Sequence, residues 1–263
     1  MDAPVLFERE GPVARITLNR PARRNAIGGG MGEALDAVLA ALRADAQVRV
    51  VVLSGAGGHF CAGLDLTEVA GDGTADERLA AQQARNRAVG ARFEAISRLP
   101  QVVVAAIEGA AHAGGLGFVC CADIAFASAD ARFAAPEVRR GLVPAQILPW
   151  LARRMNRAQA TRMVLEGRVL DAAEAARIGL VHGVAGDRAG LDAMVAACVA
   201  AVAQGGPRAL AETKTLIAAL GPISPDGYTE AGAASFGRTA AGDEAMEGIA
   251  AFREKRPAAW AKP

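Results

Sequence analysis

The sequence predicts an α/β core followed by a helical C-terminal region. Three apolar runs, at residues 13–18, 48–53 and 102–107, are rich in β-branched residues and have the composition of buried strands. Helical spacing dominates the second half of the chain, where strands nearly vanish. With 263 residues, 52% of them hydrophobic, the chain is long enough to bury a substantial core. We expect the α/β core to span residues 1–200 and the helical region to span 201–263.

Strands and helices alternate through the first half of the chain. The strand at 13–18 ends before Pro21, because a residue that precedes proline avoids the helical region. The strand at 48–53 ends at a glycine-rich stretch that cannot continue it. The remaining elements expected here are a helix at 31–43, a polar loop at 71–76, a helix at 80–99, a helix from Gly114 toward Cys121 and a short strand at 123–127.

The second half of the chain shows the apolar spacing of successive helices, separated by glycine-proline turns at 205–207 and 221–222. The expected helices cover residues 147–155, 157–166, 172–178, 191–203, 208–220 and 243–254.

The composition argues against several classes of protein. The 29 basic and 28 acidic residues are interspersed and give a net charge of +1, which is not the footprint of a nucleic-acid binder. The cysteines Cys61, Cys120, Cys121 and Cys198 form no Cys-x-x-Cys pair, so we expect reduced thiols in a cytoplasmic protein. No uncharged apolar run approaches roughly 18 residues, and the first residues lack the order of a signal peptide. The histidines are scattered without metal-ligand spacing, so no metal site is expected.

Two glycine-rich turns, at residues 58–66 and 112–117, each follow a predicted buried strand. Where such a turn leads into a helix, unpaired N–H groups point outward and favour negative charge. Two turns on neighbouring strands could direct two donors at one oxygen, which is the geometry of an oxyanion hole. Ordinary strand-to-helix turns remain the alternative interpretation of each turn alone. Dinucleotide binding is disfavoured, since residues 55–60 lack the third glycine of the fingerprint.

Taken together, the segments of this chain resemble the crotonase family, also called the enoyl-CoA hydratase/isomerase family. The resemblance covers essentially the whole chain through residues 16–27, 51–66, 103–128, 131–144, 157–184 and 247–257. It implies a spiral of repeated β-β-α units and a C-terminal helical region that drives assembly into a homotrimer or a dimer of trimers. It also implies an acyl-CoA thioester substrate and no separate cofactor.

The resemblance further implies which residues serve the substrate. The N–H groups of Leu64 and Gly114 match the family's oxyanion donors. The CoA moiety is expected along residues 23–26 and 62–66, with contacts from Arg23, Arg24, Ala26, Ala62, Asp65 and Leu66. Phe252 and Lys255 match positions that reach the CoA of a neighbouring subunit, although an amphipathic terminal helix explains them nearly as well.

The carboxylates leave the reaction open. Hydratases of this family commonly use two glutamates, one of which matches Glu137, whereas Gly117 occupies the position of the other. A single carboxylate is compatible with a hydratase of a 2-enoyl-CoA, with a Δ3,Δ2-enoyl-CoA isomerase, and with a CoA-binding subunit that has lost catalysis. Some relatives of the hydratase type also combine a glycine with a glutamate at these positions. We expect a raised pKa for Glu137 if it lies in an apolar pocket.

Five further residues are considered for the missing function. His112 is either a surrogate acid or base facing the acyl pocket or a cap of the turn, and the cap is favoured. Gln146 is either a hydrogen-bond partner for a polar substrate tail or a helix-start residue, with the second favoured. Asp65 is expected to cap the helix that follows it, although some family members place a working acid near this point. His59 is expected to pack or to contact the CoA edge, and Glu108 is a weak candidate for the missing acid.

Overall fold

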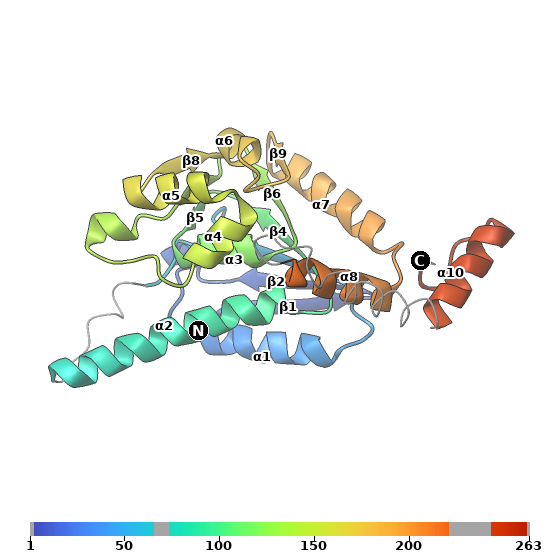
Figure 1. Ribbon diagram of the computed structural model, residues 1–263, viewed down its shortest axis with the longest axis horizontal. Helices are drawn as coiled ribbons and strands as arrows, with labels where there is room; N and C mark the ends of the chain where they lie inside the picture. Colours follow the sequence, from blue (N-terminus) through green and yellow to red (C-terminus); the bar gives the residue numbers. More distant parts are fainter. Residues whose placement is uncertain (1–2, 66–73, 221–242, 262–263) are drawn as a thin grey trace.

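The computed structural model describes residues 3–65, 74–220 and 243–261, which fold around a large mixed sheet (Figure 1). The strand order of this sheet is β1-β2-β3-β4-β6-β9. Only the edge pair β1–β2 is antiparallel, and every other neighbouring pair is parallel. The strands are β1 (Val5–Glu10), β2 (Val13–Leu18), β3 (Val50–Gly55), β4 (Val102–Ile107), β6 (Ile124–Ser128) and β9 (Gly183–Ala185).

A second, three-stranded sheet has the order β5-β7-β8. It contains β5 (Ala110–His112), β7 (Arg132–Ala134) and β8 (Val169–Asp171), of which β5 and β7 run parallel. The chain leaves the large sheet at the end of β4 and enters the small one at β5 after two residues. The second glycine-rich turn, at residues 112–117, therefore follows β5 of the small sheet and does not follow β4 directly.

The helices surround both sheets, and α1 and α2 lie against each other along one side of the large sheet (Figure 1). They are α1 (Met31–Ala44), α2 (Ala75–Ser97), α3 (Gly114–Cys121), α4 (Leu148–Arg154), α5 (Arg157–Glu166), α6 (Ala172–Arg177), α7 (Arg188–Val202), α8 (Pro207–Ala219) and α10 (Asp243–Glu254). Short 3-10 turns are formed by η1 (Pro21–Arg23), η3 (Glu137–Arg140) and η4 (Ala259–Ala261).

The apolar runs of the sequence are explained by burial on both faces of the large sheet. Successive side chains of a strand point to opposite faces, so Val51 and Leu53 join the main core while Val50 and Val52 join a second core. The second core is closed by α7, which buries Val195 against the sheet. A strand that is covered on both faces has no side exposed to solvent, which is why residues 48–53 do not alternate regularly between apolar and polar side chains.

The predicted α/β architecture is confirmed, but five strands were missed. The three-residue strands β5, β7, β8 and β9 are too short for a periodic pattern, and β1 is exposed at five of its six positions. The expected loop at 71–76 is wrong at its end, because Thr74 and Glu77 form a capping box that starts α2 at Ala75. Residues 71–73 lie outside the described residues.

Polar contacts tie the C-terminal region to the core and join its own helices to one another. The Lys214 ammonium on α8 lies 2.6 Å from the Asp123 carboxylate beside β6. The Glu244 carboxylate on α10 accepts hydrogen bonds from the first N–H groups of α8, at 2.8 Å for Arg208. The Trp260 indole donates to the Gln204 carbonyl at 2.9 Å. The boundary near residue 200 stays a prediction.

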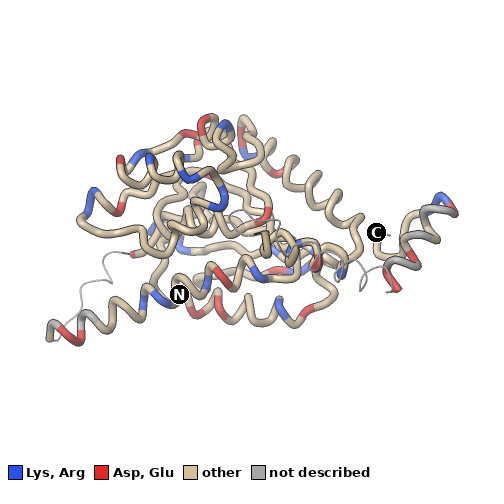
Figure 2. Tube along the Cα trace, in the orientation of Figure 1, with Lys and Arg blue, Asp and Glu red and all other residues tan. Residues whose placement is uncertain are grey.

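Charge is distributed without a dominant sign on the face seen in Figure 2, where acidic and basic residues are interspersed. Among the described residues, no single helix is long and apolar enough to cross a membrane, and only α7 and α8 together, bent by 105°, meet the length and composition. Within the same residues, no group of His, Cys, Asp and Glu side chains could hold a metal ion.

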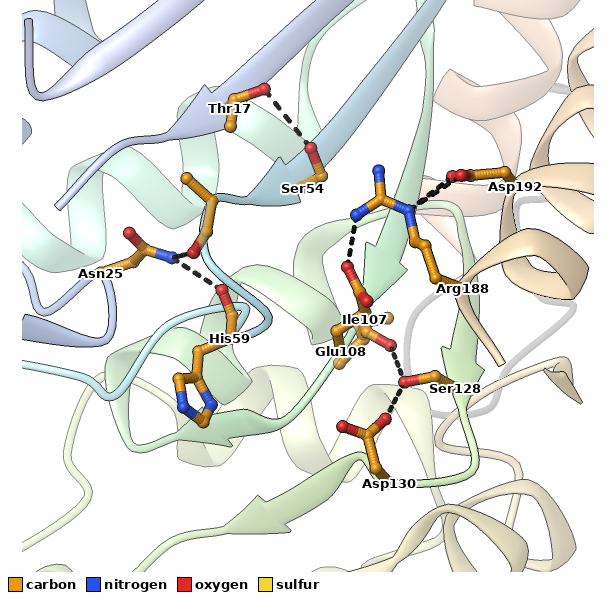
Figure 3. Close-up of polar contacts among 11 residues, drawn as sticks. Thr17, Asn25, Ser54, His59, Ile107, Glu108, Ser128, Asp130, Arg188 and Asp192 are labelled. Atoms are coloured by element: carbon orange, nitrogen blue, oxygen red, sulfur yellow. Dashed lines mark hydrogen bonds and ion pairs between the residues drawn. The ribbon is translucent and has the colours of Figure 1, made fainter. Parts of the chain in front are cut away.

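Asn25 connects the segment after β2 to the turn after β3 (Figure 3). The side chain is fully buried, and its backbone has a φ of 55°. Its amide nitrogen donates to the carbonyls of Ala56 (2.8 Å) and His59 (2.6 Å), and its oxygen accepts from the Arg20 N–H at 2.8 Å. One side chain thus satisfies three backbone groups and holds the first glycine-rich turn in place.

Replacement of Asn25 by alanine is expected to lower the free energy of unfolding by at least about 2 kcal/mol, because buried backbone groups lose their partners. Urea unfolding monitored by circular dichroism measures the change. Asn19→Ala is the matched control, since the Asn19 side chain makes one exposed hydrogen bond, to the Ala3 carbonyl. Equal losses in the two variants would contradict the role given to Asn25.

Candidate functional site

The first glycine-rich turn runs beside β5 as a short additional strand. The Cys61 N–H donates to the Ala110 carbonyl at 2.8 Å, and the His112 N–H donates to the Cys61 carbonyl at 2.9 Å. Burial raises the pKa of the Cys61 thiol to about 12, so this side chain stays protonated and serves packing. The two turns identified in the sequence are therefore adjacent in space.

The backbone after Cys61 is fixed on its other side by Ile27. The Ile27 N–H donates to the Gly63 carbonyl at 2.7 Å, and the Asp65 N–H donates to the Ile27 carbonyl at 3.0 Å. Between these two bonds, the Leu64 N–H makes no hydrogen bond to any described residue. The Leu64 side chain is partly exposed.

The second N–H group belongs to Gly114, the first residue of α3. No described residue accepts a hydrogen bond from it, as is usual for the first turn of a helix. A Cβ atom built on Gly63 would lie 3.4 Å from the Gly114 nitrogen. The peptide that carries the Leu64 N–H and the start of α3 are thus brought together, each with an unpaired donor.

This close approach requires residues without bulky side chains. A Cβ on Gly63 would lie 2.7 Å from the Ala113 Cβ, and Gly63 has a φ of 89°. A Cβ on Gly115 would lie within 3.0 Å of the Cys61 backbone. Ala113 itself has a φ of 50° and a ψ of −120°, a conformation that costs about 1–3 kcal/mol in a non-glycine residue. This backbone conformation of Ala113 turns the chain from β5 into α3.

Glu137 begins the 3-10 turn η3 and is half-buried. Its Oε2 atom is buried and makes no hydrogen bond to a described residue. Burial raises the pKa of this carboxyl, against the smaller opposing effects of a backbone hydrogen bond and the positive charge of Arg140. The expectation of a raised pKa is confirmed. A raised pKa favours the protonated form that a general acid needs.

His112 lies on β5 opposite Ala134 of β7, the strand that leads to Glu137. Its Nε2 atom is buried without a partner among the described residues, and no hydrogen bond of its side chain to a described backbone group is found, so the favoured cap is wrong. Burial lowers the pKa of this imidazole, helped by the charges of Arg140 and Arg24, and leaves it neutral at pH 7. A role in the acyl pocket stays a prediction.

Gly117 is buried one turn after Gly114 on α3 and faces the ring of Phe93 from α2.

Gln146 also contacts α2, since its side-chain amide donates to the Asn86 side chain at 2.7 Å. It does not cap α4, whose first residue is Leu148. Contact of Gln146 with a polar substrate tail stays a prediction.

The residues predicted to line the CoA path gather around Arg20. The Arg20 guanidinium donates to the Ala26 carbonyl at 2.7 Å and lies 3.2 Å from the buried Asp65 carboxylate. The Ala62 N–H donates to the Arg24 carbonyl at 2.9 Å. Arg23 and Arg24 are both exposed. Leu66, and the helix that Asp65 was expected to cap, lie outside the described residues.

The two C-terminal residues predicted to reach a neighbouring CoA lie at the end of α10. Lys255 is exposed directly after the helix and has a φ of 53°. The side chain of Phe252 is outside the described part of the structure. Their role stays a prediction.

Glu108 and His59 belong to structural networks (Figure 3). The Glu108 carboxylate lies 2.6 Å from the Arg188 guanidinium, which also binds Asp192 at 2.9 Å. Glu108 is thus engaged in an ion pair, which gives it a structural role, and its candidacy as the missing acid stays a prediction. The His59 Nδ1 atom accepts a hydrogen bond from the Ala110 N–H at 3.1 Å, in agreement with the packing role expected for it.

Sequence reasoning missed Phe93 and Arg140. Arg140 lies three residues after Glu137 in η3, and that spacing was an available signal. Phe93 gave no signal, because it meets Gly117 only through the packing of α2 on α3.

Comparison with known proteins identifies the family. The family model described as enoyl-CoA hydratase/isomerase matches residues 8–263. The chain belongs to the enoyl-CoA hydratase/isomerase family. The crystal structure of Pseudomonas aeruginosa AtuE is similar to this chain with a TM-score of 0.93 and 40% identity, over 99% of this chain and 100% of that one.

Two further proteins are similar to this chain over nearly its whole length. A structure of an enoyl-CoA hydratase/isomerase from Marinobacter aquaeolei has a TM-score of 0.91 and 36% identity, over 98% of this chain and 99% of the other. A Bacillus subtilis protein named a probable enoyl-CoA hydratase is 32% identical over 93% of both chains. These similarities confirm the crotonase-like fold predicted from the sequence.

Gly63→Ala is expected to reduce turnover of an enoyl-CoA by at least tenfold, because the new Cβ would push the first turn away from α3. Gly58→Ala is the matched control: Gly58 also has a positive φ, of 75°, but a Cβ there meets nothing within 4 Å. Steady-state kinetics and thermal midpoints of both variants separate strain from displacement of the donors. Equal activity in the two variants would contradict the expectation.

Arg140→Gln is expected to shift the acid limb of the kcat/KM profile to higher pH. The positive charge of Arg140 lowers the pKa of Glu137, so its removal raises that pKa further, and the ionised form is lost at a higher pH as the pH falls. Arg139→Gln is the control, since Arg139 binds the Glu166 carbonyl at 2.8 Å. A shift to lower pH, or the same shift in both variants, would contradict this assignment.

Proposed function

We propose that this chain adds water across the 2,3 double bond of a 2-enoyl-CoA thioester. The observation that carries the proposal is that the N–H groups of Leu64 and Gly114 lie close together, and that neither donates to a described residue. A site with two such donors and a carboxyl group of raised pKa fits a reaction that places negative charge on a carbonyl oxygen. Membership in the enoyl-CoA hydratase/isomerase family supports an acyl-CoA substrate.

In the proposed mechanism, the thioester oxygen accepts hydrogen bonds from both N–H groups. Attack of water at C3 moves electrons through the double bond onto this oxygen and forms an enolate. The two donors then stabilise the enolate more strongly than the neutral carbonyl, and loss of one donor typically costs about 2.7–4 kcal/mol of transition-state stabilisation. Collapse of the enolate with protonation at C2 gives the 3-hydroxyacyl thioester.

Glu137 handles the protons in this scheme. Its ionised carboxylate takes a proton from the attacking water, and the protonated group then supplies a proton to C2. The buried, unpaired Oε2 atom is available for this hydrogen bond. Burial raises the pKa of Glu137, which makes its protonated form easier to reach than that of an exposed carboxylate, as one group acting in two directions requires.

Isomerisation of a 3-enoyl-CoA is the second candidate function, and Gly117 is the observation that favours it. With glycine at this position, Glu137 is the single glutamate predicted for proton transfer. Removal of a proton from C2 by Glu137 and its return at C4 would use the same enolate and the same donors. We favour hydration because the relatives compared above include one that carries a hydratase name.

The proposal also covers the assembly of the subunits and their location in the cell. We infer a homotrimer or a dimer of trimers in the cytoplasm, in which Phe252 and Lys255 of one subunit approach the CoA of another. The exposed position of Lys255 at the end of α10 supports such a contact. Sedimentation velocity of the purified protein tests the assembly.

Incubation with a 2-enoyl-CoA and a 3-enoyl-CoA in heavy-oxygen water distinguishes the functions. We expect label in a 3-hydroxyacyl product from the 2-enoyl thioester. Double-bond migration without label would instead establish isomerisation, and absence of turnover with retained CoA binding would establish a binding role.

Glu137→Gln is expected to reduce turnover by at least about 100-fold with binding of the thioester retained, since proton-transfer groups contribute about 10²–10⁴-fold. Glu166→Gln, at an exposed glutamate of α5, is the control for the same chemical change. Turnover within a few-fold of the native enzyme in the Glu137 variant would remove this residue from the mechanism.

A further inference from the structure

The face of α3 that follows the Gly114 donor is covered by an aromatic ring. Gly117 lies three residues after Gly114, so the two positions share one face of the helix. A Cβ on Gly117 would lie within 3.0 Å of three ring atoms of Phe93. The ring therefore occupies the volume that any side chain at position 117 would need.

The Phe93 ring is held rigidly in this place. It is fully buried and meets the Phe118 ring edge-to-face, with centroids 5.5 Å apart and an interplanar angle of 83°. The neighbouring Arg92 is buried and binds Asp36 of α1 with two hydrogen bonds of 2.9 Å. It also donates to the Gly32 carbonyl at 3.2 Å. These contacts fix the rotation of α2 about its axis, and with it the direction of Phe93.

One turn earlier, α2 is fixed against the segment that follows Glu137. A Cβ on Gly90 would lie within 3.0 Å of the Gln146 carboxamide, which also binds Asn86. Glycine at position 90 thus lets Gln146 lie directly on the helix. The same helix contacts α3 through Phe93 and the segment after the catalytic carboxyl through Gly90.

From these contacts we propose that Phe93 restricts the site to a single carboxylate, and so determines that Glu137 alone transfers protons. The inference rests on the function proposed above and extends it to the residue that sets how many carboxyl groups can transfer protons in the site. Position 117 is glycine because α2 already fills its side-chain volume. A carboxylate there would have to displace the ring, so replacement of Gly117 alone cannot create a second acid.

The test is a set of variants that combines Gly117→Glu with Phe93→Ala. We expect Gly117→Glu alone to lower the thermal midpoint by about 5 °C or more, because the new side chain collides with a buried ring. Phe93→Ala also lowers the midpoint by leaving a cavity. In the double variant, we expect the loss of thermal midpoint to be well below the sum of the two single losses, since each change relieves the damage caused by the other.

The catalytic readout uses the same variants in a Glu137→Gln background with crotonyl-CoA as the 2-enoyl thioester. Hydration by the triple variant is expected to exceed that of Phe93→Ala/Glu137→Gln by at least tenfold, because the new carboxylate can transfer protons. Phe118→Ala combined with Gly117→Glu is the matched control: it removes the neighbouring buried ring without freeing the volume over position 117.

Additive midpoint losses, equal rescue by Phe118→Ala, or a folded triple variant without any gain in hydration would each overturn the proposal. Failure of the proposed function has a different signature, in which the native enzyme turns over neither a 2-enoyl-CoA nor a 3-enoyl-CoA. In that case, the non-additivity of the thermal midpoints of the Phe93 and Gly117 variants still decides whether the Phe93 ring fills the side-chain volume of position 117.

Discussion

The site depends on one close approach of backbone to backbone, where the turn after β3 meets the start of α3. Gly63 and Gly115 leave no room for a Cβ at this contact, and Ala113 bears the strained conformation that redirects the chain. Neither the Leu64 nor the Gly114 N–H group donates to a described residue, while their neighbours are hydrogen-bonded. In the proposed mechanism, the two donors are therefore oriented before any ligand binds. Preorganised dipoles of this kind stabilise developing charge without reorganising in the reaction.

The surrounding polar network keeps this contact in register. The Asn25 side chain bonds to backbone groups of Arg20, Ala56 and His59. The Arg20–Asp65 ion pair fixes the residue that directly follows Leu64. Both Asn25 and Asp65 are almost completely buried, where unpaired polar groups are expensive. Their burial makes the position of the donors a consequence of folding rather than of substrate binding.

In the proposed mechanism, the side chains that pack beside the two donors select the chemistry. Glu137 is half-buried, and its Oε2 atom has no partner among the described residues, whereas Glu108 and Asp65 form ion pairs with arginines. Carboxylates of similar sequence appearance therefore divide into one with a raised pKa and two that serve structure. The long helix α2 contributes to the selection, because it places the Phe93 ring over Gly117.

The sequence by itself determined the family, the alternation of strands and helices, the two glycine turns and the glutamate, since these are local patterns of residue type and spacing. The tertiary structure alone decided the rest: the short strands β5 and β7, the pairing of Glu108 with Arg188, and the meeting of Phe93 with Gly117. The reason is physical. Three-residue strands carry no period, and the partner of a buried charge or ring is chosen by packing between elements that lie far apart in the chain.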